Sequence, residues 1–91
     1  MAQVTFTVNE LASRKPELAG ELEAEIREAA GRYEPGALTL DCRILVDLDL
    51  EGEPSRVRVQ FERPGWVKTF GISLEQPRED VRRAAESVLI P

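Results

Sequence analysis

The chain has 91 residues, of which 42% are hydrophobic and 32% are charged, with a formal net charge of −5, one cysteine and no histidine. This length and composition predict one globular domain spanning residues 1–91, because a disordered chain has too few apolar residues to build a core. The absence of histidine excludes Ser-His-Asp and Cys-His nucleophiles, and it excludes zinc sites that need histidine or paired cysteines.

No targeting segment is expected, because the opening residues MAQVTFTVNE carry neither a basic stretch nor a long apolar run. No apolar segment approaches the ~20 residues that a transmembrane helix needs, so a membrane partner is not expected. The single Cys42 cannot form an internal disulfide, which fits a reducing compartment. We therefore expect a cytoplasmic protein. Without a glycine-rich phosphate loop or a metal-ligand set, we expect no cofactor and no enzymatic activity.

The first two expected elements are a short strand and a helix. Val4, Phe6 and Val8 alternate with polar residues, which is the period of a strand with one buried face. A helix is expected over residues 16–33, because proline suits the first turn of a helix and the Glu-Pro-Gly sequence at residues 34–36 ends it. The apolar stripe of this helix comprises Leu18, Leu22, Ile26, Ala29, Ala30 and Tyr33.

The same helix is rich in glutamate. Glu17 and Glu21 suit its N-terminal end, where the helix dipole is positive. An acidic helix surface can also contact a protein partner, and four residues are candidates for that contact: Glu17, Glu21, Glu25 and Glu28.

The clearest pattern in the chain is the alternation from Leu38 to Leu50, in which every even position is apolar. It predicts a long strand with one buried and one solvated face. A turn at residues 51–54 and a second strand over residues 55–62 follow. Cys42 lies in phase with the buried positions, so we interpret it as a structural thiol.

The pairing of these two strands can be predicted from their residues. With Leu50 opposite Ser55, the apolar residues share one face and opposite charges meet across the other. The predicted pairs are Asp49–Arg56, Asp47–Arg58, Arg43–Glu62, Leu48–Val57, Val46–Val59 and Ile44–Phe61.

The segment between the two strands has a second interpretation. Residues 47–53 have the spacing that opens a calcium-binding loop. However, Arg58 stands at the position where such a loop needs a bidentate glutamate. We therefore interpret the segment as a solvated turn and expect no metal there.

A second turn and a third strand follow. Residues 63–66, Arg-Pro-Gly-Trp, have the composition of a tight turn, and residues 67–74 continue as a strand. Trp66 and Lys68 share the core-facing side near its open end, either at the rim of the core or displaced by a bulge. An aromatic side chain flanked by two cations is typical of a contact surface, so Arg63, Trp66 and Lys68 are candidate partner-binding residues. The core-facing residues of this strand are Phe70, Ile72 and Leu74.

The last expected element is a helix that begins at Pro77 and buries Val81, Ala84, Ala85 and Val88. A strand–helix–strand crossover is right-handed, so the first strand should run parallel to the second. The expected fold class is therefore α+β. It is a two-layer sandwich in the order β-α-β-β-β-α, with a four-stranded mixed sheet and both helices on one face.

The layout from Val4 to Leu89 consists of a strand, a long helix that ends in Tyr33, a three-strand meander and a final helix. In this order and spacing the chain resembles the ribosome hibernation-promoting factor family, whose fold is akin to the double-stranded RNA-binding domain. The resemblance implies a protein that binds ribosomal RNA through cations on its helices. It assigns no binding residue of this chain.

Two classes of function remain. The first is a small non-enzymatic protein-interaction module, such as a regulator, inhibitor or assembly factor, whose sheet edges can also pair with a second copy. The second is a factor associated with ribosomes or structured RNA, which the net charge of −5 disfavours because phosphate binding needs clustered positive charge. An acidic helix face alone favours the first class. A contiguous patch of cations favours the second, comprising Arg63, Lys68, Arg78 and Arg82.

Overall fold

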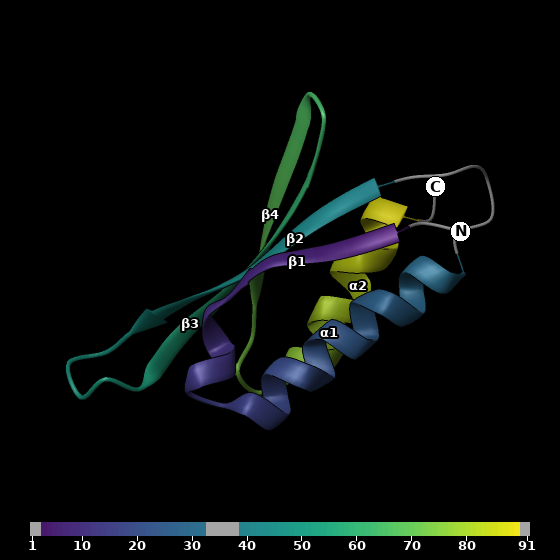
Figure 1. Cartoon of the computed structure of the whole chain (residues 1–91). Coiled ribbons are helices and arrows are strands. Elements are labelled where there is room, and N and C mark those ends of the chain that lie inside the picture. Colours follow the sequence, from purple (N-terminus) through teal and green to yellow (C-terminus); the bar gives the residue numbers. More distant parts are fainter. Residues whose placement is uncertain (1–2, 33–38, 90–91) are drawn as a thin grey trace.

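A computed structural model describes residues 3–32 and 39–89. The elements follow one another as β1 (Gln3–Asn9), η1 (Glu10–Ser13), α1 (Pro16–Gly31), β2 (Thr39–Leu48), β3 (Pro54–Arg63), β4 (Trp66–Ile72) and α2 (Pro77–Leu89). The predicted α+β class and element order are confirmed, and both helices lie on one face of the sheet (Figure 1). The short 3-10 helix η1 is the element that the sequence pattern does not predict. The predicted helix end at Tyr33 lies outside the described residues.

The four strands form one sheet in the order β1-β2-β3-β4. β1 runs parallel to β2, as the predicted crossover requires, and the other pairs are antiparallel. A register shift between Phe6 and Val8 places Val8 opposite Arg43. Val4 and Phe6 pack against the core, but the predicted alternation ends there, because the extra residue in β1 turns Val8 away from the helices.

The predicted register of β2 and β3 is wrong by two residues. Ile44 pairs with Val59, where Phe61 was predicted, and Asp47 pairs with Arg56. A shift of two keeps every side chain on its predicted face, because side chains in a strand alternate with a period of two. The predicted contact between Asp47 and Arg58 nevertheless forms diagonally across the strands, with 3.2 Å between Oδ1 and Nη2.

The physical cause of the shift is the loop that joins the two strands. Strand β2 ends at Leu48, and the Asp49 carboxylate accepts hydrogen bonds from the backbone N–H groups of Glu51 and Glu53 at 2.9 and 3.0 Å. The Asp49 side chain therefore closes the loop, where a cross-strand pair with an arginine was predicted. Leu48 and Leu50 are exposed as a consequence, contrary to the prediction that both face the core.

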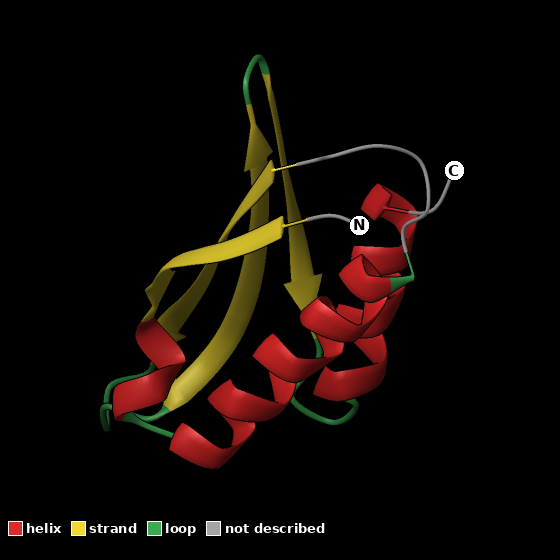
Figure 2. Cartoon of the chain, turned by 45° about the vertical axis from the view of Figure 1, so that its right-hand side comes forward, coloured by secondary structure: helices red, strands yellow, loops and turns green. Residues whose placement is uncertain are grey.

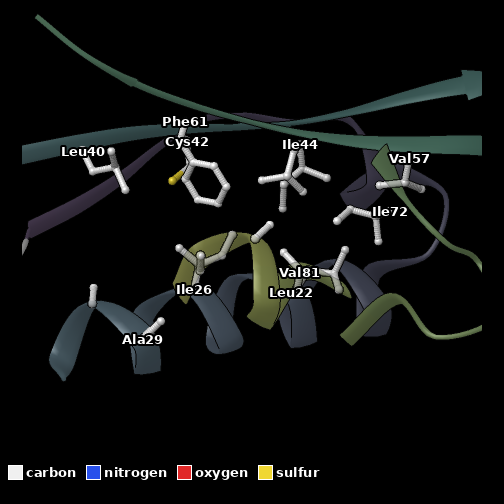
Figure 3. Close-up of a cluster of buried hydrophobic side chains, with 14 of the residues drawn as sticks. Leu22, Ile26, Ala29, Leu40, Cys42, Ile44, Val57, Phe61, Ile72 and Val81 are labelled. Carbon is white, nitrogen blue, oxygen red and sulfur yellow. The ribbon is translucent and has the colours of Figure 1, made fainter. Parts of the chain in front are cut away.

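The core lies between the sheet and the helices (Figure 3). Leu22 and Ile26 of α1 point toward Ile44 and Phe61 of the sheet, and all four side chains are fully buried. Complete burial of each such side chain stabilises the fold by about 1.5–3 kcal/mol. Cys42 is also buried, as predicted.

The last strand is shorter than predicted, and one residue that was predicted to face the core does not. Strand β4 ends at Ile72, and Leu74 is 40% exposed although the pattern placed it in the core. The chain turns away at Ser73, whose backbone N–H donates to Asp80 Oδ2 at the start of α2 (2.8 Å).

None of the described helices is long and apolar enough to cross a membrane.

Candidate functional site

The β3–β4 hairpin projects beyond the helical layer, so its far end is not covered by α1 or α2 (Figure 2). Arg63 pairs with Trp66 across the two-residue turn Pro64-Gly65. Proline fixes its own φ, and Gly65 has a φ of +76°, a value that other residues rarely adopt. We call residues 62–68 the hairpin arm.

The three candidate residues of the second turn meet on this arm. Trp66 is half-buried and packs against the edge of the core, so of the two predicted alternatives the rim position is confirmed. The Arg63 guanidinium lies 4.7 Å from the centroid of the Trp66 ring. The Lys68 ammonium lies 5.2 Å from the centroid of Phe70. Such cation–aromatic contacts hold both cations close to the surface of the arm.

A hollow of about 440 Å³ opens beside the arm, lined by Thr39, Asp41, Glu62 and residues 63–67. Asp41 and Glu62 are direct partners in the β2–β3 ladder. Like charges placed directly opposite each other destabilise a sheet. Val67, which the sequence analysis did not single out, is 58% exposed here. The arm therefore combines a half-buried aromatic residue, an exposed apolar side chain and uncompensated charge around one hollow.

The acidic residues of α1 do not share one environment. Glu17, Glu21 and Glu28 are exposed. Glu25 is 12% exposed, and its Oε1 lies 3.1 Å from Nη2 of Arg78 on α2. Glu25 therefore belongs to the contact between the helices, and its carboxylate is not available to a partner. The figures also show that α1 and the hairpin arm lie apart (Figures 1 and 2), so the two predicted contact surfaces are separate.

The four cations that would form a continuous basic patch are divided between two places. Arg63 and Lys68 belong to the arm, whereas Arg78 and Arg82 lie at the start of α2, beyond the other end of β4. Arg78 pairs with Glu25, and Arg82 approaches Glu79 to 3.6 Å. The arrangement that would favour RNA binding is therefore not formed.

Cys42 is the one thiol of the chain. Its pKa is raised from 9.0 to about 12, mainly by burial and in addition by the nearby Asp41 carboxylate, while Arg27 opposes the change. The group is therefore a neutral thiol at physiological pH and does not act as a nucleophile. No group of three or more metal-ligating side chains is present among residues 3–32 and 39–89.

Comparisons with protein-family models, with curated proteins and with solved structures found no match to this chain. A function therefore has to be argued from the residues and surfaces described above.

Proposed function

We propose that this chain is a small non-enzymatic protein-interaction module and that the hairpin arm is its contact surface. The supporting observation is the position of Trp66 on an arm that projects beyond the helices, with Arg63 stacked on its ring and a hollow of about 440 Å³ beside it. Tryptophan and arginine are enriched among the residues that dominate binding energy at protein interfaces.

The composition of the arm supports a protein partner more than a nucleic acid. Arg63 lines the hollow together with the Glu62 and Asp41 carboxylates, and Lys68 is the one further cation of the arm, so the surface lacks the clustered positive charge that phosphate groups need. The chemistry of the chain also supports a role without catalysis, because its thiol is buried and it has no histidine. The proposal includes a cytoplasmic location, which an unpaired cysteine fits.

The acidic residues of α1 are a weaker candidate surface. Glu17, Glu21 and Glu28 are exposed, but a solvated acidic face is common on surface helices. The large apolar residue beside them, Leu18, is half-buried and packs against the core, and no exposed large hydrophobic side chain lies on α1. We therefore assign the contact to the arm and use α1 as the control surface.

The proposal can be tested by placing a photo-crosslinking residue at Val67, which is exposed on the arm, and separately at Glu28, which is exposed on α1. We expect a discrete protein adduct from position 67 and none from position 28, with the adduct removed by protease but not by nuclease. The adduct should disappear in Arg63→Glu, which removes the cation stacked on Trp66. Adducts from position 28 alone, or adducts that nuclease removes, would refute the proposal.

A further inference from the structure

In the described part of the chain, side chains form hydrogen bonds with backbone groups along the edges of the sheet. Arg27 Nη1 donates to the carbonyl oxygen of Val4 in the edge strand β1 (3.4 Å). The N–H of Val46, in the part of β2 that extends beyond β1, donates to Glu10 Oε1 (2.9 Å). The N–H of Ser73, just after β4, donates to Asp80 Oδ2 (2.8 Å). Such devices prevent a second chain from pairing with the edge of a sheet.

The edge formed by β4 itself has no such protection. The two-residue turn closes on the pair Arg63–Trp66, and hydrogen-bonded and non-hydrogen-bonded pairs alternate in an antiparallel ladder. The backbone groups of Val67, Thr69 and Gly71 therefore point away from β3. The Ser73 N–H, which is in phase with them, points the same way and is the one that Asp80 satisfies.

In the described part of the chain, no hydrogen bond outside the ladder reaches Val67, Thr69 or Gly71. All three residues are exposed. The edge therefore presents three consecutive sets of backbone donors and acceptors to an extended chain, which is the arrangement that strand addition requires.

A groove runs beside this edge on the helix side. It has a volume of about 390 Å³. Its lining comprises Phe70 and Gly71 of β4 and Asp80, Arg83, Ala84 and Ser87 of α2, so its apolar part is the surface formed by Phe70 and Ala84. Phe70 is half-buried and makes an edge-to-face contact with Phe61 of the core, with 5.8 Å between ring centroids. A side chain that projects from an added strand toward the helices would rest on Phe70 and Ala84. The groove therefore suits an apolar residue.

The charge beside the groove indicates which second side chain the added strand carries. Lys68 faces the helix side two residues before Phe70, and no carboxylate of the described residues lies within ion-pair distance of its ammonium. A carboxylate opposite Lys68 would form a favourable cross-strand pair. A second copy of this chain would bring its own Lys68 to the edge and would add positive charge there. The edge therefore suits an acidic partner strand better than itself.

We infer that the β4 edge binds an extended segment of a partner protein as an additional antiparallel strand, with an apolar side chain opposite Phe70 and, two residues later, a carboxylate side chain opposite Lys68. Its backbone bonds to Val67, Thr69 and Gly71, and its apolar side chain enters the groove beside α2. The inference rests on the proposed function, because residues 66–68 of β4 form one side of the hairpin arm and the partner strand extends this contact along the rest of β4.

The test uses the full chain, immobilised, and a display library of random linear peptides of about 12 residues, which is long enough to span the strand. We expect the selected peptides to share an apolar–x–Asp/Glu pattern. Binding of a selected peptide should weaken at least about tenfold in Lys68→Glu, while Arg56→Glu, on the open face of β3, should change it less than about twofold. N-methylation of alternate peptide backbone groups should also weaken binding at least about tenfold.

Amide exchange supplies a readout that does not depend on a variant. Addition of the selected peptide should protect the N–H groups of Val67, Thr69 and Gly71 from exchange. Peptides that bind the arm without this protection, that tolerate N-methylation, or that lack the carboxylate would overturn strand addition and leave the proposed function standing. No selected peptides, or peptides that bind outside both the arm and β4, would overturn both. A free chain that sediments as a dimer with these amides already protected would assign the edge to a second copy and refute the inference.

Discussion

Glu25 of α1 and Arg78 of α2 form an ion pair of 3.1 Å across the two helices, although 53 residues separate them in the chain. The carboxylate is nearly buried, whereas the guanidinium is 60% exposed. A second pair, between Arg32 and Glu86 at 3.2 Å, joins the helices at another point. Glutamate on α1 therefore has two roles, since Glu25 fixes the position of α2 while its neighbours face solvent.

This relationship predicts different effects from two neighbouring glutamates. Glu25→Ala should lower the free energy of unfolding by about 1 kcal/mol, because it leaves Arg78 without its partner and removes a hydrogen bond from a nearly buried site. Glu28→Ala, at an exposed position of the same helix, should be close to neutral. Urea unfolding of both variants and of Arg78→Ala, combined in a double-mutant cycle, measures the coupling. Additive effects of Glu25→Ala and Arg78→Ala would contradict the assigned role.

The loop between β2 and β3 should depend on the side chain of Asp49. Asp49→Ala removes the acceptor for two backbone N–H groups, at 2.9 and 3.0 Å, and should lower the free energy of unfolding by about 1–2 kcal/mol. Asp49→Asn keeps an oxygen acceptor and should lose less than half of that amount. Thermal unfolding checks both variants, with Glu51→Ala in the same loop as the control. Equal losses in Asp49→Ala and Glu51→Ala would show that the side chain does not close the loop.

Substitution of alanine for two of the glycines should change the free energy of unfolding in opposite directions. Gly65 has a φ of +76°, so Gly65→Ala should destabilise the hairpin turn by about 1 kcal/mol. Gly20 lies within α1 with nothing near the added methyl group, and Gly20→Ala should stabilise the protein by about 0.5–1 kcal/mol through its better helix propensity. Chemical unfolding of both variants measures the difference. A stabilised Gly65→Ala variant would contradict the turn geometry.

The buried thiol should make stability fall at high pH. The pKa of Cys42 is raised from 9.0 to about 12, so above pH 9 the unfolded chain releases a proton that the folded chain retains. The stabilisation is complete below pH 9, and it is lost at about 1.4 kcal/mol per pH unit as the pH rises toward 12. Urea unfolding of the wild type and of Cys42→Ala between pH 8 and about 10.5 isolates this effect, because the variant lacks the group. A difference between the two that does not change with pH would contradict it.

Backbone amides of β4 should exchange in an alternating pattern in the free protein. Lys68 and Phe70 donate into the ladder with β3, whereas Val67, Thr69 and Gly71 point to solvent. Nuclear magnetic resonance should therefore show slow exchange at the first two positions and fast exchange at the other three. Uniformly slow exchange along β4 would indicate that the edge is already covered.

Much of the fold follows from local patterns. The alternation through β2, the proline-initiated helices and the Pro-Gly turn before Trp66 each depend on residues within a few positions of one another, and they predict the elements and their order correctly. The β3–β4 pairing, with Val59 opposite Phe70, follows from the short turn, because a two-residue turn leaves one register.

The sequence pattern is less informative about the candidate surfaces. It places Arg63, Trp66 and Lys68 together because one hairpin contains them, and the structure confirms that they meet. It groups Glu25 with the exposed glutamates, because helical spacing does not reveal that α2 packs beside that position. No pattern in the sequence predicts that the edge of β4 is free, because any of the strands could have had its edge covered by another element.

The amino-acid sequence by itself determined the four strands and the two α-helices and most of the side chains that face the core, because these depend on periodicity along a few turns or a few residues of strand. The exceptions, Val8, Leu48, Leu50 and Leu74, lie at a register shift or at the end of a strand. The β2–β3 register depends on a local loop that periodicity does not reveal, which Asp49 closes by accepting from N–H groups two and four residues later. Tertiary structure alone decided the burial of Glu25 against Arg78. It also decided that β4 is the unprotected edge. These features depend on contacts between residues that are distant in the chain, and such contacts exist only once the two layers have packed.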